Sequence, residues 1–310
     1  MKRLVCFIAA LAAAASLHAA DEGPGWYRTK IGGVSVTALW DGTMDLAVDE
    51  VFAHPGPAQL KALLARAYLK TTVPMTVNAF VVDDGRRVVL IDTGTGASRM
   101  FGDRLGHVQA NLRAGGYTPE QIDEIYITHM HTDHVGGLTL DGRAVYSRAV
   151  VRADAREAAH YLSREKLAAA GGDKEDFESA IAMLEPYVRS GRFKPFDGRT
   201  ALAAGVRALP MHGHTPGHTA YVVESDGEKL VLWGDLVHVA AVQFPRPDAT
   251  VSFEASPSQA AARRAQLYRD VAREGAWIAG AHIGFPGIGK LRAEADGGYT
   301  WVPISIVRGR

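Results

Sequence analysis

The stretch Thr128-His129-Met130-His131-Thr132-Asp133-His134-Val135-Gly136-Gly137 places three imidazoles and a carboxylate within six positions. It follows an apolar segment, 124–128, that reads as a strand. Imidazole nitrogen and carboxylate oxygen are the usual ligands of Zn²⁺ and similar divalent ions, and crowding them together would be costly without a cation. In a turn, His129 and His131 can point to one side while Asp133 and His134 reach a second position nearby. The cluster therefore suits two adjacent ions better than one.

Three later segments each place one more candidate ligand just after a predicted strand. They are Gly213-His214-Thr215-Pro216-Gly217-His218, Trp233-Gly234-Asp235 and Gly280-Ala281-His282. In layered α/β proteins, sites assemble from loops at strand ends, so distant segments can converge on one centre. The predicted metal ligands are therefore His129, His131, Asp133, His134, His214, Asp235 and His282.

Other histidine and aromatic side chains either lie near these ligands in sequence or fall in segments that could overhang them. Hydrogen bonding to the ligands and ordinary packing are both compatible with the sequence for His212, His218 and His238. Surface or core roles are expected for His54, His107 and His160. The aromatic residues that either line a pocket or fill the core are Phe101, Tyr161, Phe177 and Phe253.

Outside the histidine cluster, the chain reads as two halves, each with strands followed by helices. Strands are predicted over 34–39, 77–82, 87–91, 124–128, 149–152, 206–209, 220–223, 230–233 and 277–279. Helices are predicted over 103–114, 154–170, 174–190 and 257–274, with a short helix from Pro119 and a Ser256 cap before Pro257. No low-complexity linker separates the halves. We therefore expect a single domain over residues 21–310, with two sheets between helical layers.

The first 20 residues read as a secretory signal peptide. Lys2 and Arg3 precede the uncharged apolar run Leu4–Leu17, which is the layout of such a leader. The run is shorter than the ~20 residues that a bilayer span needs. We therefore expect an exported protein, periplasmic or secreted, that is not stably associated with a membrane after cleavage. The sequence does not fix the exact cleavage site. Cys6 is the only cysteine, so the mature chain would have no thiol ligand or nucleophile.

The charge balance argues against one class of partner. Lys and Arg together number 34, as do Asp and Glu, which gives a formal net charge of zero. No basic field would therefore draw nucleic acid to the protein, and we expect none as a partner. A small neutral substrate fits this balance better. The sequence does not fix the oligomeric state, and a homodimer is allowed for.

The ligand pattern as a whole resembles that of the metallo-β-lactamase superfamily, in order and in spacing across most of the mature chain. The resemblance implies an α/β fold with four αββα layers. It also implies that one ion is held by His129, His131 and His214 and the other by Asp133, His134 and His282. Asp235 would bridge the two ions. The turn Asp92-Thr93-Gly94 matches a strand-end turn of the same fold.

Two longer segments, 234–245 and 281–289, are similar to those of methyl parathion hydrolase and its lactonase-like relatives. That resemblance implies a hydrolase with two divalent ions, zinc being the expected metal. A metal-bridging hydroxide would attack a lactone or aryl ester carbonyl. Asp235 would hold the ions together, and Asp133 would guide the proton toward the leaving group. The predicted catalytic residues are Asp133 and Asp235.

Several alternatives stay open or are disfavoured on particular residues. Hydrolysis of organophosphate triesters is the first alternative, because one hydroxide can attack either a carbonyl or a phosphoryl centre. A non-catalytic periplasmic metal-binding protein is the second, although a structural zinc needs only about four ligands. A β-lactamase of the cysteine-containing kind is disfavoured because Asp235 stands where that cysteine would be.

Overall fold

A computed structural model describes residues 22–171, 174–203 and 205–305. The predicted signal peptide, 1–20, lies outside the described residues. Within those residues, none of the helices combines the length and the apolar character that crossing a bilayer requires.

The N-terminal half of the chain forms a seven-stranded sheet. Its order is β1 (Glu22–Gly23), β2 (Trp26–Ile31), β3 (Val34–Ala47), β5 (Thr72–Asp83), β6 (Val88–Ile91), β7 (Glu124–Tyr126) and β10 (Val150–Arg152). Strands β1 to β6 pair in antiparallel fashion, whereas β6, β7 and β10 are parallel. Parallel strands need long crossovers, and these carry the helices and the loop with the histidine cluster.

The C-terminal half forms a six-stranded sheet. Its order is β11 (Val206–Pro210), β12 (Thr219–Ser225), β13 (Glu228–Leu232), β15 (Trp277–Ala279), β16 (Ile288–Ala293) and β17 (Tyr299–Pro303). Strands β13 and β15 are parallel, and the connection between them carries α9. Two short ribbons complete the strands: β4 (Phe52–His54) with β14 (Thr250–Val251), and β8 (Thr139–Leu140) with β9 (Arg143–Ala144).

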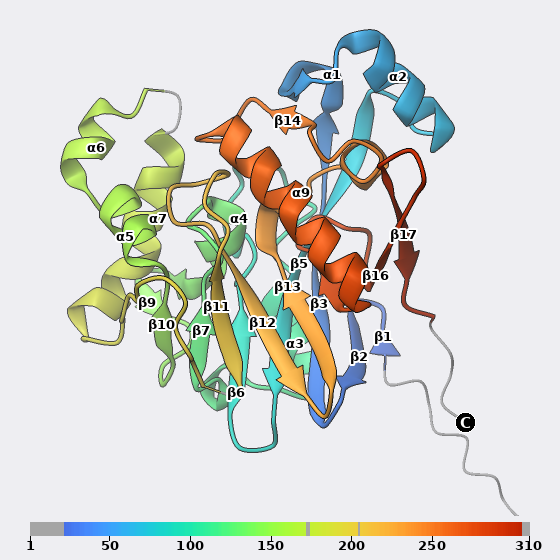
Figure 1. Cartoon of the computed structure of the whole chain (residues 1–310). Helices are drawn as coiled ribbons and strands as arrows, with labels where there is room; N and C mark the ends of the chain where they lie inside the picture. Colours follow the sequence, from blue (N-terminus) through green and yellow to red (C-terminus); the bar gives the residue numbers. More distant parts are fainter. Residues whose placement is uncertain (1–21, 172–173, 204, 306–310) are drawn as a thin grey trace, which may run out of the picture.

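Helices cover the outer faces of both sheets. The α-helices are α1 (Val48–Val51), α2 (Pro57–Arg66), α3 (Val108–Ala114), α4 (Thr132–Val135), α5 (Ala155–Tyr161), α6 (Arg164–Ala169), α7 (Lys174–Arg189), α8 (Ala240–Gln243) and α9 (Pro257–Glu274). The 3₁₀ turns are η1 (Pro119–Gln121), η2 (Gly136–Leu138) and η3 (Gly234–Leu236). In Figure 1, α9 crosses the six-stranded sheet, while α1 and α2 project beyond the ends of β3 and β5. The predicted four-layer αββα fold is confirmed.

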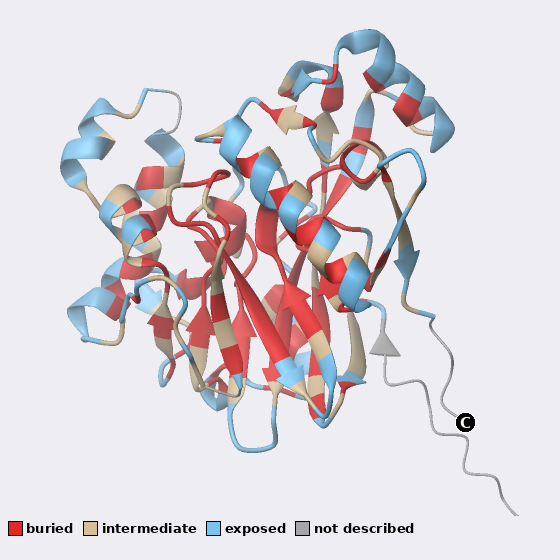
Figure 2. Cartoon of the chain, in the orientation of Figure 1, coloured by how far each residue is buried: buried red, intermediate tan, exposed pale blue. Residues whose placement is uncertain are grey.

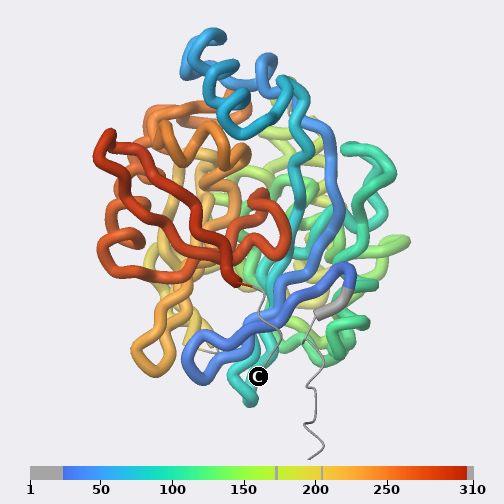
Figure 3. The backbone as a smooth tube through the Cα atoms, turned by 90° about the vertical axis from the view of Figure 1, so that its right-hand side faces the viewer, coloured from blue at the N-terminus to red at the C-terminus, as the bar shows by residue number. Residues whose placement is uncertain are grey.

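The core explains why the apolar runs in the central strands are continuous. Side chains alternate between the two faces of a strand. On β5, Phe80 and Val82 face the cluster between the two sheets, while Ala79 and Val81 face the cluster under the outer helices. Both faces are therefore buried. Figure 2 shows the buried residues filling both sheets, and Figure 3 shows the N- and C-terminal halves lying on opposite sides.

The structure corrects several predicted element boundaries. The helix predicted over 103–114 begins only at Val108, because the preceding segment is a loop in which Gly106 has a φ of 93°. The helix predicted over 154–170 is two helices, since Ser163 caps α6 by accepting a hydrogen bond from Lys166 N–H. Ser256 stands at the N-cap position of α9, but its side chain makes no capping hydrogen bond. The bounds of α9 and β15 agree with the prediction.

Candidate metal centre

All seven predicted ligands lie together at one end of the two sheets, on four loops. The loops follow β7, β11, β13 and β15. The first loop turns directly into α4, whose first residue, Thr132, donates its N–H and its hydroxyl to Asp176 Oδ1 of α7, both at 3.0 Å. This contact fixes the start of α4, so that His131 before it and Asp133 and His134 within it face the same space. The ligand atoms form two groups, and within each group they lie within 4.8 Å of one another.

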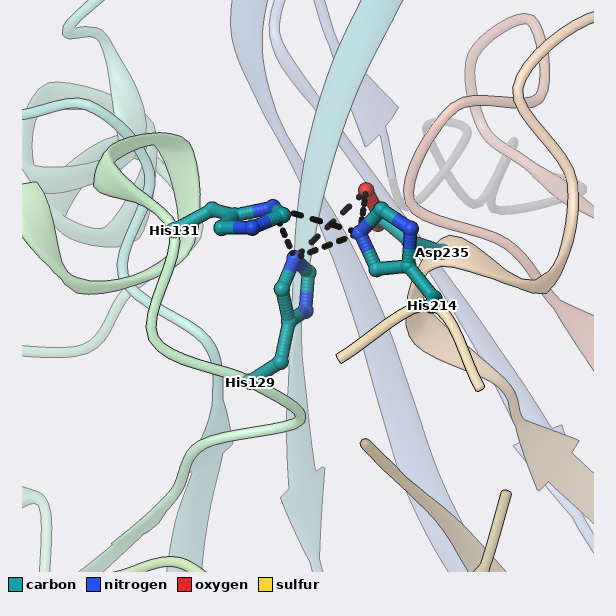
Figure 4. Close-up of side chains that lie close together, drawn as sticks. All are labelled: His129, His131, His214 and Asp235. Atoms are coloured by element: carbon teal, nitrogen blue, oxygen red, sulfur yellow. Dashed lines mark hydrogen bonds and ion pairs between the residues drawn. The ribbon is translucent and has the colours of Figure 1, made fainter. Parts of the chain in front are cut away.

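The first group is a triangle of three imidazole nitrogens with a carboxylate beside it. His129 Nε2 lies 3.0 Å from His131 Nδ1, and His214 Nε2 lies 3.2 Å from each of these two atoms. Asp235 Oδ2 is 3.6 Å from His129 Nε2 and 3.5 Å from His214 Nε2. Figure 4 shows the four side chains pointing toward one another, His129 and His131 from one loop and His214 and Asp235 from two others.

The second group shares Asp235 with the first. Asp235 Oδ1 lies 3.0 Å from His134 Nε2, and Asp235 Oδ2 lies 3.0 Å from His282 Nε2. Asp133 Oδ2 is 3.4 Å from each of the same two histidine nitrogens. The Asp235 side chain is 4% exposed. One buried carboxylate therefore contacts ligands of both groups, which is the arrangement that two adjacent cations require.

The donor set fits divalent cations better than a network of hydrogen bonds. A tetrahedral ion bound at 2.0–2.1 Å by nitrogen separates its ligand atoms by about 3.3 Å, close to the separations in the triangle. Burial lowers the pKa of His129 and of His214 well below the usual range, so neutral imidazoles meet there. Buried His134 Nε2 and Asp235 Oδ1 have no hydrogen-bond partner although they are neighbours. Bound cations would satisfy these atoms.

A second set of contacts orients the ligand rings. Asp92 Oδ2 lies 2.8 Å from His134 Nδ1, Thr76 O lies 2.8 Å from His282 Nδ1, and the Tyr161 hydroxyl lies 3.0 Å from His131 Nε2. Asp92 also accepts the Thr128 N–H and hydroxyl, and it has a φ of 59°. Such contacts fix ring tautomers and orientations. The turn that carries Asp92 therefore supports the second group of ligands.

We expect the substitution Asp92→Asn to weaken the second ion selectively. An amide at this position would still fill the space but would present a weaker acceptor to His134 Nδ1. Loss of a hydrogen bond that orients a ligand typically costs 10–100-fold in metal affinity. Chelator competition with zinc-loaded protein would measure the affinity of each ion. If the variant bound the second ion as tightly as the unsubstituted protein does, the prediction would be wrong.

The sequence left two roles open for His212, His218 and His238, hydrogen bonding to the ligands and ordinary packing, and the structure places the three differently. His218 positions Asp235, because its Nε2 accepts the Asp235 N–H at 3.0 Å and its Nδ1 lies 3.2 Å from Met211 O. Burial lowers the pKa of His218 to about 4, which keeps the ring a neutral acceptor. His238 Nε2 lies 3.3 Å from Asp235 Oδ2, and the His238 ring stacks on that of His282. His212 is near Asp154, at 3.5 Å.

The centre opens into a cavity of about 440 Å³. Apolar side chains, among them Met44, Met75 and Met100, line it together with several acidic side chains. Apart from the candidate ligands, the acidic residues of the lining are Asp45, Asp176 and Glu254. Among the described residues, no Lys or Arg lines this cavity. A neutral and largely apolar substrate therefore suits it.

The aromatic predictions have mixed outcomes. Phe101, Tyr161 and Phe253 line the cavity, whereas Phe177 is buried in the core against Tyr161. His160, predicted to have a surface or core role, lines the cavity as well. His54 is half-exposed and contacts Asp248, and His107 stacks on Trp40.

Sequence reasoning missed two acidic residues that shape the site. Glu157 on α5 accepts hydrogen bonds from two of the ligand loops, and Asp176 on α7 caps the helix of the first loop. Both lie in helices that the sequence predicted as ordinary amphipathic segments. The signal available was only an acidic residue on an otherwise apolar helix face, which does not distinguish a buried carboxylate from a solvated one.

Comparison with known proteins agrees with this geometry. The model of the metallo-beta-lactamase superfamily matches residues 72–282, and the chain belongs to that superfamily. The structure of the hydrolase AbOPH is 34% identical with a TM-score of 0.86, over 92% of this chain and 99% of that one. AidC, a dizinc quorum-quenching lactonase solved with the product N-hexanoyl-L-homoserine, is 25% identical with a TM-score of 0.82, over 91% and 98%.

A curated relative points to the same class. N-acyl homoserine lactonase of Bacillus cereus is 23% identical over 175 residues, which are 51% of this chain. The matched segment spans 62% of that lactonase. The fold and these matches thus place the chain in a superfamily whose matched members are metal-dependent hydrolases.

Proposed function

We propose that this protein is a binuclear metal-dependent hydrolase of lactones or aryl esters. The observation that carries the proposal is the pair of ligand groups joined by Asp235, in a cavity that no Lys or Arg of the described residues lines. The lactonase neighbours named above support the substrate class by similarity. Zinc is the expected metal because the ligands are imidazoles and carboxylates and a similar protein is a dizinc enzyme.

The protein's own residues divide the chemistry between them. Two bound divalent ions would activate water as a nucleophile and polarise the substrate oxygen. The negative charge of Asp235 would compensate part of the positive charge of the two ions. Asp133 lines the cavity and is 5% exposed, so its carboxylate can reach a substrate and accept the proton of the attacking water. The apolar side chains of the lining would help to desolvate the substrate.

Organophosphate triesters are the second candidate substrate class. Phe253 lies at the cavity edge, with its ring centroid 4.9 Å from that of His238 and 6.0 Å from that of His214. An aromatic leaving group could stack there, whether it departs from a carbonyl or from a phosphoryl centre. We also propose that the protein is exported and acts outside the cytoplasm, as the leader predicts.

We expect the purified protein to contain about two divalent ions per chain and to lose its activity on chelation. Seven ligands exceed the four or so that one tetrahedral ion needs. Elemental analysis would measure the metal, and a panel of lactones and aryl esters would measure turnover before chelation and after zinc is restored. Fully active protein with one ion or none would refute the binuclear proposal. Two tightly bound ions without any hydrolysis would favour the non-catalytic alternative.

A further inference from the structure

Glu157, on α5, joins two of the loops that carry the first group of ligands. Its Oε1 accepts the N–H of Met130 at 2.9 Å, between ligands His129 and His131. Its Oε2 accepts the Thr215 hydroxyl at 2.8 Å and the Gly217 N–H at 2.7 Å, directly after ligand His214. One carboxylate therefore links segments about 85 residues apart in the chain, and both segments supply nitrogens to the same triangle.

The contact between α5 and the ligand loop after β11 is too close for a side chain at position 217. A Cβ built on Gly217 would lie 2.4 Å from Glu157 N and 2.7 Å from Glu157 Cβ. The glycine in the segment Gly-His-Thr-Pro-Gly-His is therefore explained by the approach of Glu157. One turn later on the same helix, Tyr161 contacts His131 Nε2. Helix α5 thus supports all three histidines of the first group.

Among the described residues, no Lys or Arg forms an ion pair with Glu157, whose carboxylate accepts hydrogen bonds from the Met130 and Gly217 N–H groups and the Thr215 hydroxyl. The side chain is 0% exposed. A buried carboxylate without a counter-ion is costly. Burial raises the pKa of Glu157, while the Met130 N–H, the Thr215 hydroxyl, the charge of His131 and the Gly217 N–H oppose the rise. A divalent cation in the neighbouring triangle would supply the missing positive charge.

We infer that Glu157 is a positioning residue for the ion held by His129, His131 and His214, setting both the geometry and the affinity of that group. The inference rests on the proposed binuclear centre. It predicts an effect on one ion and not on the other, because the second group is oriented by Asp92 and Thr76 from different segments. A purely structural glutamate would instead stabilise the metal-free and the metal-loaded protein alike.

The test is the substitution Glu157→Gln, with the exposed Glu165→Gln as the matched control. The amide keeps the shape, removes the charge and turns an NH₂ group toward at least one of the three donors. In chelator competition with the zinc-loaded protein, we expect one ion to bind about 10–100-fold more weakly. We also expect the unfolding temperature of the metal-free protein to change less than that of the loaded protein. The control should match the unsubstituted protein in both measurements.

Two further variants assign the effect to one group and guard against a variant that does not fold. Thr215→Val removes one hydrogen bond to Glu157 and keeps its charge, so it should weaken the same ion by less and add little to Glu157→Gln. Asp92→Asn should weaken the other ion more than the first, and its effect should be coupled only partly to either change, because the two groups share Asp235 but are oriented by different residues. Unchanged affinities, or equal destabilisation of metal-free and loaded protein, would overturn the role of Glu157. Failure of the unsubstituted protein to bind two ions would overturn the proposed centre instead.

Discussion

Replacement of Asp235 by asparagine should lower kcat/KM for any substrate by about a thousandfold or more and reduce the metal content below two ions per chain. The loss of a single preorganised electrostatic group commonly costs 10²–10³-fold, and here the group also holds the ions. Asp235 contacts His134, His282, His129 and His214 with its two oxygens. A neutral amide would leave the repulsion between two cations uncompensated.

The electrostatics of the buried site make this substitution severe. Burial alone would raise the pKa of Asp235, but the charges of His134 and His282 beside it hold it well below its usual range. The carboxylate is therefore charged throughout the neutral pH range. Asparagine removes that charge, and because the side chain is only 4% exposed, water cannot compensate for the loss. His218 would still hold the backbone in place, since it contacts the N–H of residue 235 and not its side chain.

The measurement is kcat/KM together with zinc content, determined on the same samples. Asp84→Asn is the matched control, because Asp84 is exposed in the β5–β6 turn, away from the metal centre. The control should keep both activity and metal. If Asp235→Asn retained near-normal turnover with two bound ions, Asp235 could not be the group that joins them.

The candidate site was predictable because its ligands are unusual residues in short, ordered segments. His129 to His134 lie within one turn, so their proximity follows from chain geometry alone. The convergence of His214, Asp235 and His282 could be anticipated from the resemblance, since each follows a strand and strand ends meet at one edge of a sheet. Long apolar runs such as those in β5 and β6 likewise predicted buried strands, because the pattern that indicates them is local in the sequence.

What escaped prediction depends on contacts between distant elements. The segment from Val48 to Arg66 has no strong periodicity, and its helices are held by packing of Leu60 and Leu64 against Val242 of α8. The loop before α3 could not be told from a helix start, because its shape depends on Asp41, which accepts the N–H groups of Thr95 and Val108. Phe244 lies within the segment 234–245 but stacks on Trp301 of β17, a contact between distant elements that the local sequence does not indicate.

Lactones or aryl esters should be hydrolysed with a kcat/KM at least about 10–100-fold higher than that for a penicillin, and phosphotriesters should be hydrolysed detectably. The reason is charge. A penicillin carries a carboxylate, and a hydrogen bond to a charged group contributes about 1.5–3 kcal/mol, equivalent to that range of rates. Within the described part of the chain, the cavity offers no Lys or Arg to make it. It instead presents the carboxylate of Asp176, whereas Glu254 and Asp45 are already paired with Arg264 and Arg104, both at 2.7 Å.

The apolar wall favours the expected substrates for a separate reason. Met44 and Met75 are buried beside the cavity, and methionine adapts its shape to different apolar groups. We therefore expect dihydrocoumarin and an N-acyl homoserine lactone to be good substrates, a dimethyl aryl phosphotriester to be a weaker one, and a penicillin to be the poorest. Steady-state kcat/KM for the four compounds measures this order. The methyl ester of the same penicillin is the matched control, because it lacks the charge, and its kcat/KM should exceed that of the free acid. A clear preference for the free penicillin would show that the cavity recognises a carboxylate after all, and the proposed substrate class would be wrong.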